Sequence, residues 1–337
     1  MNTPRVRRAS VRVPASTSNL GAGFDFVGMA VDRWLRVSVE LRESSRDDAG
    51  MVTIRRTGTL RALDDAGLSD VRQDLIYVGF NEVLRTTGGR DGFNGAIHFE
   101  ADSDIPIGKG LGSSAAALLA GAALANETQG LGLSLQALAQ GCASVEGHGD
   151  NVAPAALGGA VLVTPAWPCP AFSPLPIHES LGFAFAVPDF QTSTEVARAV
   201  LPSHVTFRTA VAAAARAASL VQGLSTGNRQ QLTAGLADVL HVEHRKPLVP
   251  HFERVTAAAR TAGAIGATLS GSGSSIVAVA PREIAAQVAA EMADAWREVG
   301  VQADAFATRV CQAGLAILPS NGSGVVPTHL PRNIACP

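Results

Sequence analysis

A glycine-rich stretch at residues 106–117 carries the residue types that bind phosphate in proteins. Three glycines alternate through it, two serines follow, and a run of alanine and leucine continues to about residue 126. Glycine allows sharp turns and lets a ligand approach main-chain N–H groups, while alanine and leucine favour a helix. The stretch therefore predicts a loop that opens into a helix, with a phosphate held at the free N–H groups and positive dipole end of that helix.

Other glycine-loop motifs fit this stretch less well. It is not a Walker A loop, because Lys109 is not followed by Ser or Thr. Residues 110–115 match the dinucleotide pattern G-x-G-x-x-A, but that motif needs an acidic residue about 20 positions later at the end of a strand. The nearest candidate, Glu127, ends a predicted helix instead. A tight turn of small residues remains the structural alternative, and the loop alone does not identify the phosphate.

Two more small-residue loops and one polar loop accompany this stretch. Residues 16–25 and 269–275 are rich in glycine and serine, and residues 146–154 carry a glutamate, a histidine, an aspartate and an asparagine. Simple turns do not require three such glycine loops in one chain. We therefore expect the three loops to line one cleft between two domains.

The residue types in these loops suit phosphoryl transfer. That reaction needs a cradle for phosphates, a divalent metal on hard oxygen ligands and a positioned hydroxyl acceptor. Ser113 or Ser114, together with the carboxylate of Glu146, can supply the metal ligands. Asn19 and Asp25 can bind a cationic or polar acceptor. A solvated helix end is the alternative interpretation of Glu146, because exposed carboxylates are common.

Composition excludes several other classes of function. The chain has 337 residues, which is enough for two domains. Its net charge of −2 gives no basic surface for nucleic acid, and 5% aromatic residues are too few for base-stacking platforms. No apolar run reaches the roughly 18 residues of a membrane span, and residues 1–10 lack the apolar core of a signal peptide. We expect a cytoplasmic protein with no nucleic-acid or membrane partner.

Hydrophobic periodicity predicts the elements that must position these loops. Strands are expected at residues 9–14, 35–41, 51–56, 93–100, 158–164, 183–187, 276–279 and 315–318. Helices are expected at residues 72–87, 113–126, 134–145, 194–200, 206–222, 229–240, 252–262 and 283–299. The first strand is expected to stop at Pro14, and the proline-rich stretch 165–176 is expected to cross between the domains.

Three blocks of the sequence together resemble a known family. Residues 13–25, 106–116 and 266–275 are similar, in the same order, to the three signature blocks of the GHMP small-molecule kinases. Within that superfamily the chain is most similar to the homoserine kinases. Residues 146–155 resemble the block E-G-H-P-D-N-V-A-P-A of that family, and residues 193–202 and 245–250 match two further blocks. The resemblance covers residues 9–318.

The resemblance implies a fold and a reaction. The fold is a two-domain α+β structure, with an N-terminal domain like ribosomal protein S5 domain 2 at residues 9–165 and a ferredoxin-like C-terminal domain at 166–319. Residues 320–337 would form a tail. The implied reaction transfers phosphate from ATP to L-homoserine and yields ADP and O-phospho-L-homoserine, a step of threonine biosynthesis. The implied cofactors are ATP and Mg²⁺.

The resemblance also assigns site residues. The Mg²⁺ ligands fall on Ser114 and Glu146, and Asp150 and Asn151 belong to the catalytic site without either being named as a general base. The acceptor pocket falls on Asn19, Asp25, His148, Arg198 and Arg245. The ATP site falls on Pro106, Ile107, Gly108, Lys109, Gly110, Leu111, Gly112, Ser113, Ser114, Ala115, Ala116, Asp74, Gly271 and Gly273.

The chemistry of homoserine fits the pocket residues. Homoserine is a zwitterion whose carboxylate suits the forked donors of Arg198 and Arg245. Its ammonium suits Asp25, while Asn19 and His148 are expected to orient the remaining polar groups.

The sequence departs from the family pattern at three positions. Gly149 and Ser274 stand where the family usually has proline. Asp74 stands where an asparagine often contacts adenine, and a carboxylate cannot donate the same hydrogen bonds. Selectivity for the base is therefore left open.

Several alternatives stay open at this point. His241, His244 and His251 with Glu243 are a less favoured metal cluster, because no H-E-x-x-H pattern accompanies them. Lys109 is expected to face solvent or to steer phosphate. A kinase of the same fold acting on another small amino alcohol or polyol is one alternative function, and a silent sensor that binds ATP and a metabolite is another. The sequence does not decide the oligomeric state, and a homodimer is compatible with it.

Overall fold

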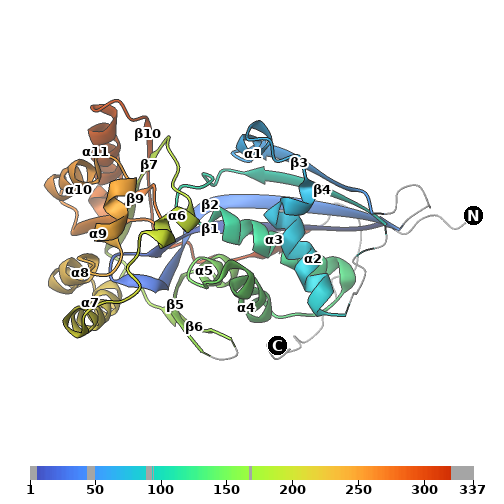
Figure 1. The fold of residues 1–337 in the computed structure, drawn as a ribbon, viewed down its shortest axis with the longest axis horizontal. Helices are drawn as coiled ribbons and strands as arrows, with labels where there is room; N and C mark the ends of the chain where they lie inside the picture. Colours follow the sequence, from blue (N-terminus) through green and yellow to red (C-terminus); the bar gives the residue numbers. More distant parts are fainter. Residues whose placement is uncertain (1–5, 44–49, 89–92, 94, 167–168, 320–337) are drawn as a thin grey trace, which may run out of the picture.

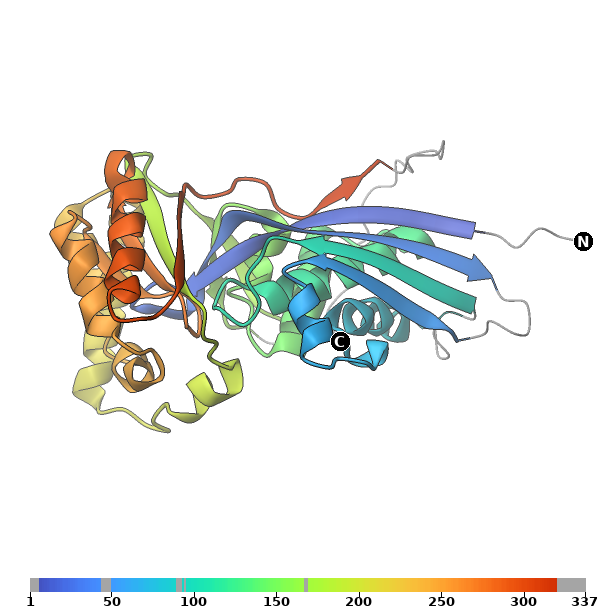
Figure 2. The same cartoon turned by 90° about the horizontal axis from the view of Figure 1, so that it is seen from above.

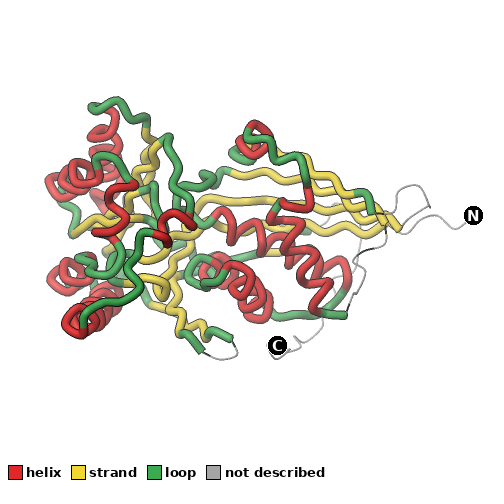
Figure 3. The backbone as a smooth tube through the Cα atoms, in the orientation of Figure 1, coloured by secondary structure: helices red, strands yellow, loops and turns green. Residues whose placement is uncertain are grey.

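The computed structural model describes residues 6–43, 50–88, 93, 95–166 and 169–319. It divides into two bodies, each with its own sheet and its own helices (Figure 1, Figure 3). In Figure 1 the sheet that contains β7, β9 and β10 lies at the left, and the sheet that contains β3 and β4 extends to the right. Within the described residues, no helix combines the length and apolar character needed to cross a membrane.

The larger sheet is built on two long strands, β1 (Val6–Asn19) and β2 (Gly23–Glu43). The long strands run side by side toward the N-terminus (Figure 2). The strand order is β11-β1-β2-β4-β3, with β5 paired to β2 and β6 paired to β5. The other strands are β3 (Val52–Gly58), β4 (Gly95–Ser103), β5 (Ala160–Thr164), β6 (Ala171–Leu175) and β11 (Ala316–Leu318). Strand β3 pairs with β4 in parallel, and the remaining pairs are antiparallel.

The expectation that the first strand stops at Pro14 was wrong. Strand β1 continues to Asn19, and its register against β2 shifts directly after Pro14. A proline lacks the N–H that a regular ladder uses, so a strand tolerates it at an irregularity of this kind. The continuation carries residues 15–19 to the smaller sheet, where Asn19 forms an isolated bridge with Ser270.

Helices cover one face of the larger sheet. Helix α3 (Ser113–Gln129) packs against β1, β2 and α2 (Leu75–Thr86), and nearly all of its residues after the first turn are buried. Its alanines and glycines allow close packing. A Cβ on Gly121 would lie 1.9 Å from the carbonyl oxygen of Ile76 in α2, so the two helix backbones are in direct contact. The remaining helical segments of this half are α1 (Arg61–Asp65), η1 (Val71–Gln73), α4 (Leu135–Glu146) and α5 (Val152–Leu157).

The smaller sheet has the strand order β10-β7-β9-β8, and all of its pairs are antiparallel. Its strands are β7 (Leu181–Pro188), β8 (Gly266–Leu269), β9 (Ile276–Pro281) and β10 (Ala303–Thr308). Its helical segments are α6 (Thr194–Ala199), α7 (Phe207–Thr226), α8 (Arg229–Leu236), α9 (Val242–Arg245), η2 (Lys246–Leu248), α10 (Phe252–Thr261), η3 (Arg282–Ile284) and α11 (Ala285–Arg297). The succession of strand, helices, two strands, helix and strand is the ferredoxin-like βαββαβ pattern. The predicted α+β two-domain fold is therefore confirmed.

Strand β7 joins the two halves because both of its faces are buried. Phe183 and Phe185 pack into the core that contains β1, β2 and α3, while Ala184 and Ala186 pack into the core beneath α10 and α11.

The expected domain boundary at residues 165 and 166 falls inside the β5–β6 hairpin of the larger sheet. Pro174 lies within β6, which pairs with β5 and with no other strand in the described part of the chain. A strand at the edge of a sheet accepts proline. The two sheets separate between Leu175 and Leu181, and β11 returns to the larger sheet. We therefore propose residues 176–180 as the crossing. The predicted tail at 320–337 lies outside the described residues.

Candidate active site

A cavity of about 320 Å³ is lined by residues from both halves of the molecule. All three small-residue loops contribute to it, as expected from the sequence. One end is apolar, with Leu60, Leu63, Leu68, Leu75, Ile76 and Ile107. The other end is polar, with Asn19, Asp25, His148, Asp150, Arg198 and Arg245. Gly112, Ser113 and Ser114 at the start of α3 also line the cavity.

Direct hydrogen bonds hold the three loops together. The Ser270 hydroxyl donates to the carbonyl of Gly110 at 2.7 Å and lies 2.8 Å from the Thr17 hydroxyl. The Gly271 N–H donates to the carbonyl of Ser18 at 3.1 Å. Gly110 has a φ of +75°, and a Cβ there would lie 2.0 Å from the Ser270 carbonyl oxygen. Only glycine fits where the loops meet.

The start of α3 has the properties of an anion site. Its N-cap is Gly112, with a φ of 66°, so no side chain caps the first turn. The first N–H groups of a helix have no partner within the helix, and the helix dipole adds partial positive charge there. Gly112, Ser113 and Ser114 line the cavity at this point. A phosphate chain fits this position.

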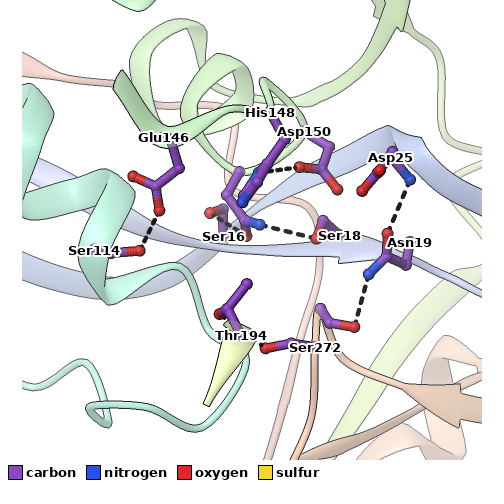
Figure 4. Close-up of polar contacts among 12 residues, drawn as sticks. Ser16, Ser18, Asn19, Asp25, Ser114, Glu146, His148, Asp150, Thr194 and Ser272 are labelled. Atoms are coloured by element: carbon purple, nitrogen blue, oxygen red, sulfur yellow. Dashed lines mark hydrogen bonds and ion pairs between the residues drawn. The ribbon is translucent and has the colours of Figure 1, made fainter. Parts of the chain in front are cut away.

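Ser114 and Glu146 form the candidate metal site. The Ser114 hydroxyl donates to Oε1 of Glu146 at 2.5 Å (Figure 4). Glu146 is the last residue of α4, where the helix dipole adds negative charge rather than neutralising the carboxylate. Glu146 is half-buried, and no Lys or Arg of the described chain forms an ion pair with it. A carboxylate and a hydroxyl in this arrangement suit a divalent cation that takes further oxygen ligands from phosphate.

Asp25 and Arg198 form a two-pronged ion pair at the polar end. The two guanidinium nitrogens donate to the two carboxylate oxygens at 3.0 and 2.9 Å. Asp25 has a φ of 62° near the start of β2, and Arg198 lies on α6, which is capped by Ser193. The hydrogen bonds to Asp25 raise the pKa of Arg198, and burial opposes them. The pair brings a cation and an anion together at one wall of the cavity.

Arg245 is a buried cation beside this pair. It is 2% exposed, its Nε donates to the carbonyl of Ala197 at 2.9 Å, and its guanidinium lies 5.0 Å from the centre of the Phe24 ring. Burial, followed by the charge of Arg198, lowers its pKa to about 10. Arg245 is therefore still charged at neutral pH.

His241, part of the alternative metal cluster, is committed to protein contacts. Its Nε2 lies 3.0 Å from the carbonyl of Gly21, its Nδ1 lies 3.3 Å from Arg245, and its ring stacks on Phe24. Nε2 donates to the carbonyl, so Nδ1 is free to accept from Arg245. Across the described residues, no group of three or more His, Cys, Asp or Glu side chains is arranged to hold a metal.

The polar loop after α4 contributes a histidine and two further polar residues. His148 Nδ1 lies 2.8 Å from Oδ1 of Asp150, which is 1% exposed. Burial lowers the pKa of His148, but the hydrogen bond and charge of Asp150 outweigh burial, and the net pKa is raised. Asn151 donates to the Ser18 hydroxyl at 2.9 Å and accepts from Ser16 at 3.1 Å.

Asn19 locks the turn between β1 and β2. Its amide donates to the carbonyl of Gly271 at 2.7 Å and accepts the N–H of Asp25 at 3.0 Å. Its backbone has a φ of 73°, which asparagine tolerates better than most residues. Asn19 lines the cavity, but half of its hydrogen-bonding capacity already fixes the position of Asp25.

Asp74 lines the apolar end and is held by two protein partners. Its Oδ1 accepts the N–H of Ile76 at the start of α2, and its Oδ2 accepts from Nε and Nη2 of the buried Arg56 at 3.0 and 2.8 Å. Sequence reasoning missed Arg56, since nothing in its surroundings distinguishes it from a strand residue facing solvent. It also missed the apolar residues 60–68, which fall outside the predicted elements.

The predicted residues divide into two groups. Those that line the cavity are Asn19, Asp25, Asp74, Ile107, Gly108, Gly110, Gly112, Ser113, Ser114, Glu146, His148, Asp150, Asn151, Arg198, Arg245 and Gly271. Those that lie outside its lining are Pro106, Lys109, Leu111, Ala115, Ala116 and Gly273. Lys109 does not face solvent, because it is 9% exposed and its ammonium donates to the carbonyl of Phe190 at 2.6 Å.

Sequence and structure comparisons point to one family. Residues 74–159 match the family described as GHMP kinases N terminal domain, and residues 220–298 match GHMP kinases C terminal. A homoserine kinase of Microchaete diplosiphon is 35% identical over 89% of this chain and 94% of that protein. The crystal structure of homoserine kinase from Cytophaga hutchinsonii has a TM-score of 0.80 at 30% identity, covering 93% of this chain and 98% of that one. An L. major mevalonate kinase crystallised with R-mevalonate shares the fold, with a TM-score of 0.62 at 14% identity over 92% of this chain and 97% of that one.

Proposed function

Since this chain belongs to the homoserine kinases, a family of GHMP kinases, we propose that it transfers the terminal phosphoryl group of ATP to the side-chain hydroxyl of L-homoserine. One observation of the structure supports the proposal independently of family membership. A single cavity joins the uncapped start of α3 and the Ser114–Glu146 pair to a cluster of two arginines and an aspartate. The first group suits a nucleotide, and the second suits an amino acid.

The cluster at the polar end fits a zwitterion. Arg198 has five N–H donors and uses two of them on Asp25, so others remain for a carboxylate. Arg245 adds a second positive charge whose position is fixed by protein contacts. Asp25 still has free lone pairs that can accept from an ammonium. The substrate would therefore lie along the Asp25–Arg198 pair, with its carboxylate toward the arginines and its ammonium toward the aspartate.

The middle of the cavity fits a nucleotide phosphate chain with Mg²⁺. Ser114 and Glu146 are hard oxygen donors, and Mg²⁺ in kinases is commonly bound by one or two such groups together with phosphate oxygens. When bound, Mg²⁺ would neutralise charge on the phosphates. The N–H groups at the start of α3 would hold the phosphate oxygens, and the apolar end, with Leu63 and Ile107, would take the base.

The residues around the reacting groups contribute mainly by orienting other side chains and the substrates. Asp150 is tied to His148 and lies almost fully buried, so we assign it to holding His148 rather than to removing the substrate proton. Asn151 is fixed by two serines of β1 and lines the cavity. Positioning and electrostatic stabilisation supply most of the catalysis in phosphoryl transfer. A cytoplasmic location is part of the same proposal, because ATP and free amino acids are available there.

The deciding experiment is ADP release by the purified protein with Mg-ATP. The acceptors are L-homoserine, L-threonine, L-serine, mevalonate, galactose and none. Turnover on L-homoserine alone is the expected result. Turnover on a different acceptor would keep the kinase and reject the carboxylate role of the arginines. ATP binding without turnover on any acceptor would favour the silent sensor.

A further inference from the structure

Lys109 is a buried cation that the proposed reaction does not use. It lies in the glycine loop, yet it is absent from the cavity lining, and its ammonium donates to the carbonyl of Phe190 at 2.6 Å. The same carbonyl accepts the Ser274 hydroxyl at 2.7 Å, and the Ser275 N–H donates to the carbonyl of Lys109 at 3.1 Å. One carbonyl of the smaller domain is therefore held from two glycine loops at once.

The segment that Lys109 holds leads directly to the acceptor end. We call residues 189–194 the linking segment. Thr192, Ser193 and Thr194 line the cavity, and Ser193 caps α6, which carries Arg198. Thr194 also lies 3.4 Å from the hydroxyl of Ser272 in the third loop (Figure 4). A shift of the linking segment would therefore move the residues that face the acceptor.

The other end of this segment is firmly anchored. The Phe190 ring packs edge-on against Trp296 with 6.1 Å between centroids, and Trp296 donates from its indole N–H to the carbonyl of Pro250 at 2.9 Å. Trp296 is fully buried in the core of the smaller domain. The Lys109 contact thus connects the glycine loop to a rigid part of the second domain.

Burying the Lys109 ammonium costs hydration, so another interaction must compensate for that cost. Burial lowers the pKa of Lys109, and Asp189 offsets part of that effect. An uncharged side chain of similar length would fill the same space without losing hydration. A charged N–H donor, however, makes a stronger bond to a carbonyl than a neutral group does. The stronger bond compensates for the lost hydration. We therefore interpret the Lys109–Phe190 bond as a contact that fixes the two domains relative to each other.

We propose that Lys109 is a positioning residue that couples the nucleotide loop to the acceptor end through the linking segment. The two ligands named below rest on the proposed function. Ordering of the glycine loop by a nucleotide then acts through Phe190 and steadies the cavity-lining residues 192–194 and Arg198. The acceptor consequently binds more tightly when the nucleotide is present. Because coupling is reciprocal, the nucleotide gains affinity by the same factor when the acceptor is present.

The test compares wild type with Lys109→Met by calorimetric titration. The ligands are L-homoserine and a non-hydrolysable ATP analogue with Mg²⁺, each alone and each with the other saturating. In wild type we expect the nucleotide to tighten homoserine binding about 10-fold. In Lys109→Met we expect less than about 2-fold tightening, with the affinity for the nucleotide alone almost unchanged. Arg85→Met removes an exposed cation of α2 and should behave as wild type.

Two further variants guard against a simple loss of folding. Ser274→Ala removes the second bond to the Phe190 carbonyl and should weaken the coupling less than Lys109→Met does. Lys109→Arg keeps a charged donor and should recover part of the coupling. A large loss of nucleotide affinity with homoserine binding intact would overturn the proposal and assign Lys109 to phosphate. Equal coupling in wild type and Lys109→Met would overturn it as well.

Hydrogen exchange tests the coupling role of Lys109 independently of whether L-homoserine is the acceptor. In wild type the nucleotide analogue alone should slow amide exchange in residues 190–199, and in Lys109→Met this protection should be absent. This readout does not use homoserine, so it stands even if wild type binds a different acceptor. Unchanged exchange in wild type after the nucleotide analogue binds would refute the coupling.

Discussion

The two ends of the cavity are built in different ways. At the nucleotide end the phosphate cradle comes from one continuous stretch, in which the start of α3 offers backbone N–H groups and Ser114 offers a hydroxyl, and Glu146 of α4 adds a carboxylate. The acceptor end uses charged side chains from segments far apart in the chain. Asp25 comes from β2, Arg198 from α6 and Arg245 from α9. The first end is set by local backbone geometry, and the second exists only when both domains have folded.

This difference changes what a substitution does at each end. At the acceptor end the charges neutralise one another before any substrate arrives, since Asp25 already pairs with Arg198. At the nucleotide end Glu146 has no ion-pair partner among the residues that the structure describes. Removing one charge of the Asp25–Arg198 pair leaves the other charge without its ion-pair partner. Removing the charge of Glu146 takes a ligand only from a bound cation. Substitutions at the two ends should therefore affect different kinetic constants.

Glu146→Gln tests the nucleotide end and should have the largest effect. We expect kcat to fall by at least about 1000-fold, because the charge that would hold the cation is lost. The fold should be unaffected, since Glu146 forms no ion pair with a described residue. Steady-state kinetics and circular dichroism measure the two quantities. Glu127→Gln, in the last turn of α3 and outside the cavity lining, is the control. Near-normal kcat in Glu146→Gln would remove this carboxylate from the mechanism.

Arg198→Ala tests the acceptor end. We expect the KM for homoserine to rise about 100-fold, because truncating one side of a charge pair typically costs about 2–5 kcal/mol. The KM for ATP should change less than about 2-fold, a contrast that a general loss of structure would not produce. Arg85→Ala, at an exposed pair on α2, is the control for losing an arginine. An unchanged KM for homoserine would reject the carboxylate assignment.

The contrast between local and long-range construction also explains which parts of the site could be predicted from the sequence. The glycine loops are local patterns, so the start of α3 and the meeting of three loops were predicted from residue order alone. The pairing of Asp25 with Arg198, 173 residues later, joins a strand of the larger sheet to a helix of the smaller domain. No local pattern carries that information. The sequence therefore predicted both residues for the acceptor but not their contact with each other.

Burial is the other property that the sequence did not reveal. Lys109 and Arg56 have the residue types of a surface, yet both lie at 9% exposure or less because each meets a specific acceptor. The expected domain boundary at residues 165 and 166 is a related case. Residues 171–175 contain a proline and look like a linker, but they pair with β5 at the edge of the larger sheet. Edge pairing is a tertiary property, and periodicity alone does not report it.

Gly110→Ala tests how much the contact between the glycine loops contributes to the stability of the fold. Gly110 needs a positive φ, and a Cβ there would lie 2.0 Å from the Ser270 carbonyl oxygen. Gly130 also has a positive φ but has open space around it, so Gly130→Ala is a matched control. We expect about 1 kcal/mol of destabilisation for the control and about 3 kcal/mol for Gly110→Ala. Urea unfolding measures both, and equal values would show that the contact between the loops adds nothing to stability.

His148→Gln tests the polar loop through pH, with the smallest expected effect. The hydrogen bond and charge of Asp150 outweigh burial and raise the pKa of His148 above 6.5 in the folded protein. The protonated ring therefore stabilises the fold fully below pH 6.5, and this contribution is lost as pH rises through the raised pKa. The glutamine variant should be less stable than wild type at acidic pH, by no more than about 1 kcal/mol, and the difference should shrink toward pH 8.5. Urea unfolding at several pH values gives the comparison, and a difference that grows with pH would show that the neutral ring is the form that Asp150 holds.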